Sequence, residues 1–279
     1  MSDAPAPTSW VERAVTAVGP PLVLGALGYW YGWERTQALY GYFGLDASLL
    51  GFSAQDFVVR SIEAIYTPLA ALAVAGIVVA LLHQLVTSRL SRRTGRRLGY
   101  VLIALAFLAL LIGIAGMDDI GVAHTSLVAP LMLCFASALA GYGAFLTSGR
   151  ADPRRRYGLP PLLLGSIVAI GVLGLFWLTS NYATGEGDMR AQAIASNLAR
   201  MPEVIVYSRD DLGLDSAGAS ASVDSADTAG AYHYRYGHLH LLIESAGRYF
   251  LLPDSWVRGG GTAIVLSDSS DVRIQVSEH

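Results

Sequence analysis

The sequence is dominated by apolar runs long enough to cross a lipid bilayer. A spanning helix needs about 20 mainly apolar residues, and the runs that meet this requirement are residues 15–33, 63–86, 98–117, 126–146 and 159–180. Only 15% of the 279 residues are charged, whereas soluble domains carry about 25%. We therefore expect an integral membrane protein with a disordered tail at residues 1–12 and a transmembrane bundle of about five helices at residues 13–180.

Arginines in two short connections predict the orientation of this bundle. The connections that follow the second and fourth apolar runs contain the candidate residues Arg92, Arg93, Arg96, Arg97, Arg154, Arg155 and Arg156. Short loops rich in arginine stay in the cytoplasm. We therefore expect the N-terminus inside and everything after residue 180 outside, in the plasma membrane. The same arginines form a candidate patch for anionic lipids or a cytoplasmic partner.

Beyond residue 180 the composition is that of a small extracytoplasmic α+β domain. Residues 181–200 predict an amphipathic helix, and residues 213–230, rich in Gly, Ala, Ser and Asp, predict a flexible loop. Alternating segments predict strands, listed here by position: 203–208, 231–236, 238–244, 248–252, 263–267 and 272–276. A hairpin is expected around Ser245-Ala-Gly. The domain's acidic excess argues against a nucleic-acid partner, and a chain with one cysteine has no intrachain disulfide.

The second apolar run is preceded by a charged helix face. Ser53 and Asp56 have the spacing of a helix start, and Asp56, Arg60 and Glu63 follow at i, i+4 and i+7 on one face. Asp118 and Asp119 lie at the outer end of the third run. Three interpretations remain for these groups. They line a vestibule or outer mouth that concentrates cations, or the charged helix face docks the outer domain. Alternatively, they form a salt-bridged helix face and a polar turn.

Histidines in the C-terminal domain are candidates for pH or metal sensing. His238 and His240 are two apart on a predicted strand and would share one face. Glu244, four residues along, is roughly 13 Å away, so a metal site would need a distant ligand such as Asp254 or His233. Solvent-facing strand histidines are the alternative. Since histidine titrates near neutral pH, His233, His238 and His240 together favour a pH response.

Two segments resemble a family. They are Tyr42-Phe-Gly-Leu-Asp-Ala-Ser-Leu-Leu-Gly-Phe-Ser-Ala-Gln-Asp-Phe-Val-Val-Arg60 and Tyr236-Gly-His-Leu-His-Leu-Leu-Ile-Glu-Ser-Ala-Gly-Arg-Tyr-Phe-Leu-Leu-Pro253. Both resemble stretches of uncharacterised integral membrane proteins of high-GC actinobacteria. The resemblance implies a shared architecture and brings no known activity.

The sequence leaves two classes of function. No nucleotide, hydrolase or metalloprotease motif is present, so we expect no enzyme and no cofactor. A secondary transporter is disfavoured because no acid, Lys or Arg lies deep in any run. The class we favour from the sequence is an oligomeric ion-channel-like protein, a homo-oligomer with an outer gating or sensing domain. The other is a membrane-anchored receptor or accessory subunit whose outer domain binds a protein partner.

Overall fold

A computed structural model describes residues 10–89, 91–117, 127–147, 160–217, 219–223 and 232–277. The chain divides into two compact units, which are described separately. The helical unit comprises Met1–Tyr31 and Val58–Tyr182, and the sheet unit comprises Gly32–Phe57 and Ala183–His279. The sheet unit therefore contains the end of the first helix, the connection that follows it and the start of the second helix, in addition to the C-terminal region.

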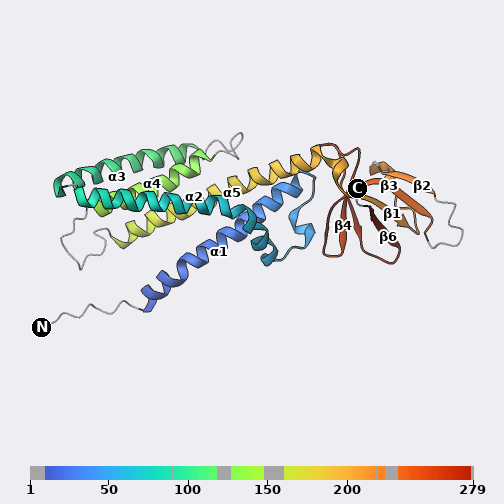
Figure 1. Cartoon of the computed structure of the whole chain (residues 1–279), viewed down its shortest axis with the longest axis horizontal. Helices are drawn as coiled ribbons and strands as arrows, with labels where there is room; N and C mark the ends of the chain where they lie inside the picture. Colours follow the sequence, from blue (N-terminus) through green and yellow to red (C-terminus); the bar gives the residue numbers. More distant parts are fainter. Residues whose placement is uncertain are drawn as a thin grey trace. The chain divides into compact units, whose positions relative to one another are not determined.

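Long helices make up the first two thirds of the chain (Figure 1). They are α1 (Trp10–Gly41), α2 (Ala54–Arg89), α3 (Arg92–Ala115), α4 (Val128–Thr147) and α5 (Pro161–Ser196). Within the described residues, three helices are long and apolar enough to cross a membrane: Arg93–Ala115, Val128–Thr147 and Leu162–Ser196. These three overlap the last three expected spans, and α5 continues without a break to Ser196, through residues that we expected to form a separate amphipathic helix. The other two expected spans lie in α1 and α2, and a count of five spans stays a prediction.

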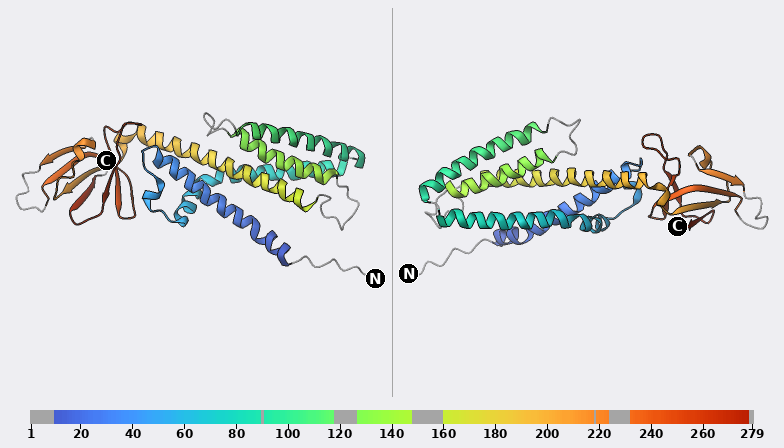
Figure 2. Two further views of the ribbon diagram at one scale, coloured as in Figure 1. Left: turned by 180° about the vertical axis from the view of Figure 1, so that it is seen from behind. Right: turned by 45° about the horizontal axis from the view of Figure 1, so that its top comes forward.

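Small residues bring α3 and α4 into contact in the helical unit. A methyl group on Gly99 would lie 2.9 Å from the carbonyl oxygen of Gly143, and one on Gly143 would lie 2.8 Å from that of Gly99. The two helices run alongside each other in both views of Figure 2. On the other side of α4, Ser137 Oγ donates to the carbonyl of Ile167 on α5 at 2.7 Å. This packing agrees with the small-residue contacts typical of membrane helices.

The sheet unit is built on a six-stranded antiparallel sheet with strand order β5-β4-β3-β1-β6 and β2 paired to β3. The strands are β1 (Glu203–Ser208), β2 (Ser220–Val223), β3 (Tyr234–Ser245), β4 (Arg248–Pro253), β5 (Ile264–Ser267) and β6 (Val272–Ser277). The predicted hairpin joins β3 to β4. Its turn residues Ala246 and Gly247 have φ of 53° and 68°, as a two-residue hairpin loop requires.

One predicted loop contains regular structure. Residues 213–230 were expected to be flexible, but Leu214–Ala217 form the 3-10 helix η3 and Ser220–Val223 form β2. Leu214 and Ala219 are buried in the core of the sheet with Val204, Val206 and Tyr236. The few apolar residues of this segment therefore hold it against the sheet, despite its polar composition.

The connection between α1 and α2 is folded into the sheet unit. It is shorter than expected, because α1 continues to Gly41, and it contains the 3-10 helix η1 (Ala47–Leu50). Leu50 is buried against Phe250 of β4, both with 0% exposure. Ser245 Oγ also donates to the carbonyl of Leu50 at 2.6 Å. These contacts join parts of the chain almost two hundred residues apart.

Candidate functional site

A β-bulge in the middle of β3 sets the geometry of the candidate site. Pairing with β1 shifts register between Val204, opposite Leu239, and Val206, opposite Tyr236. His238 lies in the bulge with φ of 60°, a left-handed conformation that is uncommon for a residue other than glycine. The partner of β3 also changes here: β2 pairs as far as Gly237, and β4 pairs from Leu239 onward.

The bulge brings two histidines to one carboxylate, Asp254, which follows β4. His240 Nε2 lies 2.6 Å from Asp254 Oδ1, and His238 Nδ1 lies 3.0 Å from Asp254 Oδ2. The side chain of His240 is 8% exposed, whereas those of His238 and Asp254 are 62% and 49% exposed. The expectation of two solvent-facing histidines is therefore wrong for His240, because the bulge breaks the regular alternation of β3.

The second ring nitrogen of His240 also faces an acceptor. Nδ1 lies 3.2 Å from the carbonyl oxygen of Met201. A neutral imidazole carries one N–H, and an imidazolium carries two. Only the protonated form of His240 can therefore donate to Asp254 and to Met201 at the same time.

Other charged groups surround this cluster. Glu203 on β1 is the cross-strand neighbour of His240, and Arg200 directly precedes Met201.

Within the described part of the chain, no group of three or more His, Cys, Asp or Glu side chains is arranged to hold a metal ion. His233 is exposed, and its backbone N–H donates to Ser208. Glu244 lies opposite Tyr249, toward the other end of β3.

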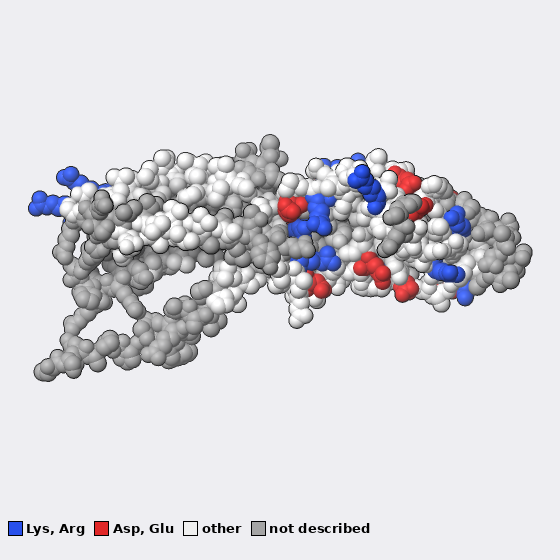
Figure 3. Space-filling view, viewed as in Figure 1, with Lys and Arg blue, Asp and Glu red and all other residues white. Residues whose placement is uncertain are grey.

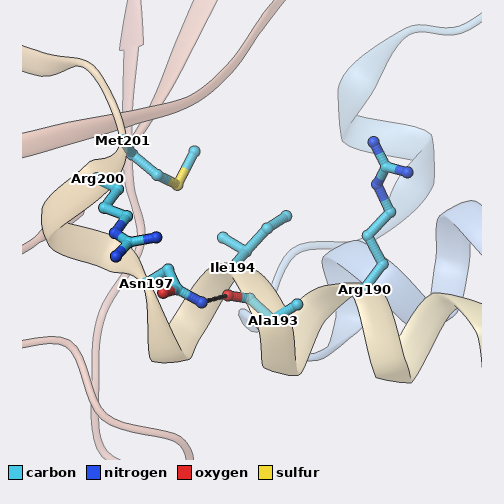
Figure 4. A pocket seen from close by; sticks show the side chains of 6 residues that line it. All are labelled: Arg190, Ala193, Ile194, Asn197, Arg200 and Met201. Atoms are coloured by element: carbon cyan, nitrogen blue, oxygen red, sulfur yellow. Dashed lines mark hydrogen bonds between the residues drawn. The ribbon is translucent and has the colours of Figure 1, made fainter. Parts of the chain in front are cut away.

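Met201 also lines an open groove at the end of α5. The groove has a volume of about 400 Å³, and its lining residues are Arg190, Ala193, Ile194, Asn197, Arg200 and Met201. Figure 4 shows Ile194 and Met201 between the guanidinium groups of Arg190 and Arg200. Asn197 Nδ2 donates to the carbonyl of Ala193 at 2.9 Å. Met201 therefore belongs to both the groove and the histidine cluster.

The sequence did not predict the groove. Residues 190, 193, 194 and 197 recur at i, i+3, i+4 and i+7 within the predicted amphipathic helix, so they share one face. That spacing was the available signal. Asp254 was anticipated as a distant partner of the histidines, whereas Met201 contributes a backbone carbonyl that no side-chain pattern reveals.

The predicted mouth residues have different environments. Asp56 caps α2, because Ser53 N and Ser53 Oγ both donate to its Oδ2 at 2.8 Å and Asp56 N donates back to Ser53 Oγ at 3.3 Å. This confirms the predicted helix start. Arg60 is exposed. The side chain of Glu63, and Asp118 and Asp119 entirely, lie outside the described residues, so the outer-mouth hypothesis stays a prediction.

The predicted basic patch is described in part. Arg93, Arg96 and Arg97 are exposed in the first turns of α3, and Arg96 donates to the hydroxyl of Tyr100 at 3.3 Å. The side chain of Arg92 and the residues Arg154, Arg155 and Arg156 lie outside the described residues. On the face shown in Figure 3, α3 and α4 carry basic side chains only near the start of α3, whereas the sheet unit carries both signs.

Comparison with known proteins gives no relative: no protein-family model, no curated protein and no solved structure matches the chain.

Proposed function

We propose that the chain is a membrane-anchored receptor whose sheet unit lies outside the cytoplasm and senses protons through His240. The observation that carries this proposal is the pair of acceptors on one buried imidazole, Asp254 Oδ1 at Nε2 and the Met201 carbonyl at Nδ1. This is the receptor class of the two functions that the sequence leaves open.

Unburied apolar surface supports the membrane part of the proposal. At most 33% of the apolar window of each candidate helix is buried inside the chain, and for α5 only 6%. Phe107 and Leu173 are 63% and 66% exposed. Exposing this much apolar surface to water is unfavourable. A lipid environment covers it without a further protein contact.

The arginines at the start of α3 support the orientation. A helix N-terminus carries a partial positive charge and disfavours nearby cations. Arg93, Arg96 and Arg97 nevertheless cluster in the first turns of α3. Retention of arginine-rich loops in the cytoplasm accounts for this placement. The residues after α5 then lie on the opposite side of the membrane.

Protonation of His240 changes the number of hydrogen bonds that the cluster makes. In the charged form, the ring donates to Asp254 and to Met201. In the neutral form the ring keeps a single N–H, so one of these two contacts loses its hydrogen bond and the stability that the bond contributes. Both contacts are therefore present while the ring is charged, and one is lost when the ring gives up its second proton.

Other titratable groups share this environment. His238 bonds the second oxygen of Asp254, Glu203 lies opposite His240 on β1, and Arg200 precedes Met201. When His238 is also protonated, two positively charged rings share the single Asp254 carboxylate. The response is therefore a property of the cluster, with His240 as its buried member.

The two contacts of His240 lie on two different connections of the sheet unit. Met201 links η2 (Leu198–Arg200), which follows α5, to β1. Asp254 lies two residues before Trp256, whose ring packs on Phe43 at a centroid distance of 4.9 Å. Losing either contact loosens the segment after α5 or the segment that holds the α1–α2 connection. This is how we expect a proton signal to reach the helices.

Hydrogen–deuterium exchange of the full chain in lipid nanodiscs tests this function. We expect residues 198–204 and 252–258 to be better protected at about pH 5.5 than at about pH 8, after correction for intrinsic exchange, because histidine titrates between these values. The difference should vanish in His240→Gln and persist in His233→Gln, a matched exposed histidine. Equal protection at both pH values, or an unchanged difference in His240→Gln, would overturn the proposal.

A further inference from the structure

We infer that the groove at the end of α5 binds an acidic, partly apolar segment of an extracytoplasmic partner protein. The groove residues Arg190, Ala193, Ile194, Asn197, Arg200 and Met201 supply two cations around an apolar floor. The inference goes beyond proton sensing, and its choice of partner rests on the membrane placement proposed above.

The groove presents mainly one face of a helix to a partner. Arg190, Ala193, Ile194 and Asn197 lie on one face of the last turns of α5, and Met201 closes one end (Figure 4). Ala193 lets another backbone approach closely. Methionine and arginine are enriched where proteins contact one another, and arginine is common among the residues that dominate binding energy.

The charges of the groove specify an acidic partner. Within the described part of the chain, neither Arg190 nor Arg200 forms an ion pair, whereas Arg209 pairs with Asp271 at 3.2 Å. Asn197 directs Nδ2 to the carbonyl of Ala193 and to Ser196 Oγ, so its donor is already used. The two guanidinium groups are the strong donors left, and their planar forks match carboxylates.

Helix length favours a protein carboxylate over a lipid headgroup. The hydrocarbon core is about 30 Å thick, which corresponds to about 20 helical residues at 1.5 Å each. Counted from the start of α5 at Pro161, the helix leaves the hydrocarbon near residue 181. Arg190, still within α5, then lies about 13 Å farther out along the helix, whereas the headgroup layer adds only about 5–8 Å. A ligand held by both arginines is therefore in water.

A synthetic helical peptide with leucines on one face, flanked by glutamates, is the probe. Fluorescence anisotropy measures its binding to the full chain in zwitterionic nanodiscs. We expect the glutamate peptide to bind, and the same peptide with lysines in place of glutamates not to bind. The variant Arg190→Gln with Arg200→Gln should bind about fivefold more weakly, the effect of losing two exposed ion pairs. Arg273→Gln, a matched exposed arginine, should bind as the wild type does.

Three results would overturn the inference. The first is that the lysine peptide binds as well as the glutamate peptide, and the second is that the double variant binds the glutamate peptide as the wild type does. The third is that the double variant loses binding to phosphatidylglycerol vesicles but not to the peptide, which would identify a lipid headgroup as the ligand. Thermal unfolding of the double variant, and partial rescue by the two Arg→Lys changes, separate lost contacts from lost folding. The hydrogen–deuterium exchange experiment above is repeated on the double variant. Because it measures proton sensing without the peptide, its result distinguishes failure of peptide binding in the groove from failure of proton sensing.

Discussion

The Nε2 atom of His240 lies 2.6 Å from Oδ1 of Asp254, and the two side chains differ sharply in their access to water. His240 is 8% exposed and Asp254 is 49% exposed. The carboxylate is therefore open to solvent, while the imidazole that depends on it is closed off. Under the proposed function, the exposed carboxylate and His238 couple the solvent to this buried ring.

Asp254→Asn should destabilise the sheet unit at mildly acidic pH. The change removes the charged acceptor that faces Nε2 of the buried His240 ring, and a hydrogen bond to a charged group contributes about 1.5–3 kcal/mol. Thermal unfolding at about pH 6, where histidine is partly charged, measures this. Asp210→Asn is the control, because Asp210 is exposed. Equal losses in the two variants would show that Asp254 has no special role.

Leu50→Ala tests whether the α1–α2 connection is part of the sheet unit. Leu50 is 0% exposed against Phe250, and its neighbour Leu49 is 45% exposed. Truncating a buried leucine costs about 2–5 kcal/mol, whereas a surface change stays within about 0.5 kcal/mol. Denaturant unfolding should separate Leu50→Ala from Leu49→Ala. Two equally mild variants would mean that the connection does not pack on β4.

Two glycines on α5 should respond in opposite directions to alanine. A methyl group on Gly187 would lie 2.5 Å from the carbonyl oxygen of Arg35, whereas one on Gly185 meets nothing within 4 Å. Gly187→Ala should cost about 1–3 kcal/mol, because α1 and α5 must separate. Gly185→Ala should stabilise by up to about 1 kcal/mol through helix propensity. Unfolding midpoints of the same sign would contradict this packing.

Tyr236→Phe should change how stability depends on pH. The N–H of Gly213, and then the Tyr236 hydroxyl, lower the pKa of Asp211. Burial, and then the bond to Asp211, raise the pKa of Tyr236. The wild type therefore keeps this stabilisation above about pH 4 and loses it as Asp211 is protonated, and it begins to lose the tyrosine contribution above about pH 10.

The difference in unfolding free energy between Tyr236→Phe and the wild type should consequently be largest near neutral pH. It should shrink toward both extremes. Tyr207→Phe, on the neighbouring strand β1, is the control and should show no such profile. A difference that is constant from acid to alkali would rule out the Asp211–Tyr236 bond.

Local patterns predicted the local elements of this chain. The alternation of residues 203–208 predicts β1 with the observed bounds, and Ser245-Ala-Gly predicts the β3–β4 turn, because both signals depend on neighbouring residues. The capping pair Ser53 and Asp56 likewise marks the start of α2. Three of the expected spans match helices long and apolar enough to cross a membrane.

The site depends on features that a local pattern does not carry. The bulge at His238 alters which residues of β3 face the core, and strict alternation cannot anticipate it. The contact between Ser245 and Leu50 joins distant segments. The groove needs the helical face of α5 together with Met201, whose position is set by the chain turning into β1.

The protonation state of His240, read by ¹⁵N NMR, tests the central claim most directly. The full chain, labelled at histidine and embedded in nanodiscs, gives ring resonances that His240→Gln assigns. We predict that His240 carries two protonated ring nitrogens at the acidic end of a pH series and one at the alkaline end, and that exchange at residues 198–204 rises as the second proton is lost. A His240 that stays neutral throughout, or that titrates without any change in exchange, would contradict the account.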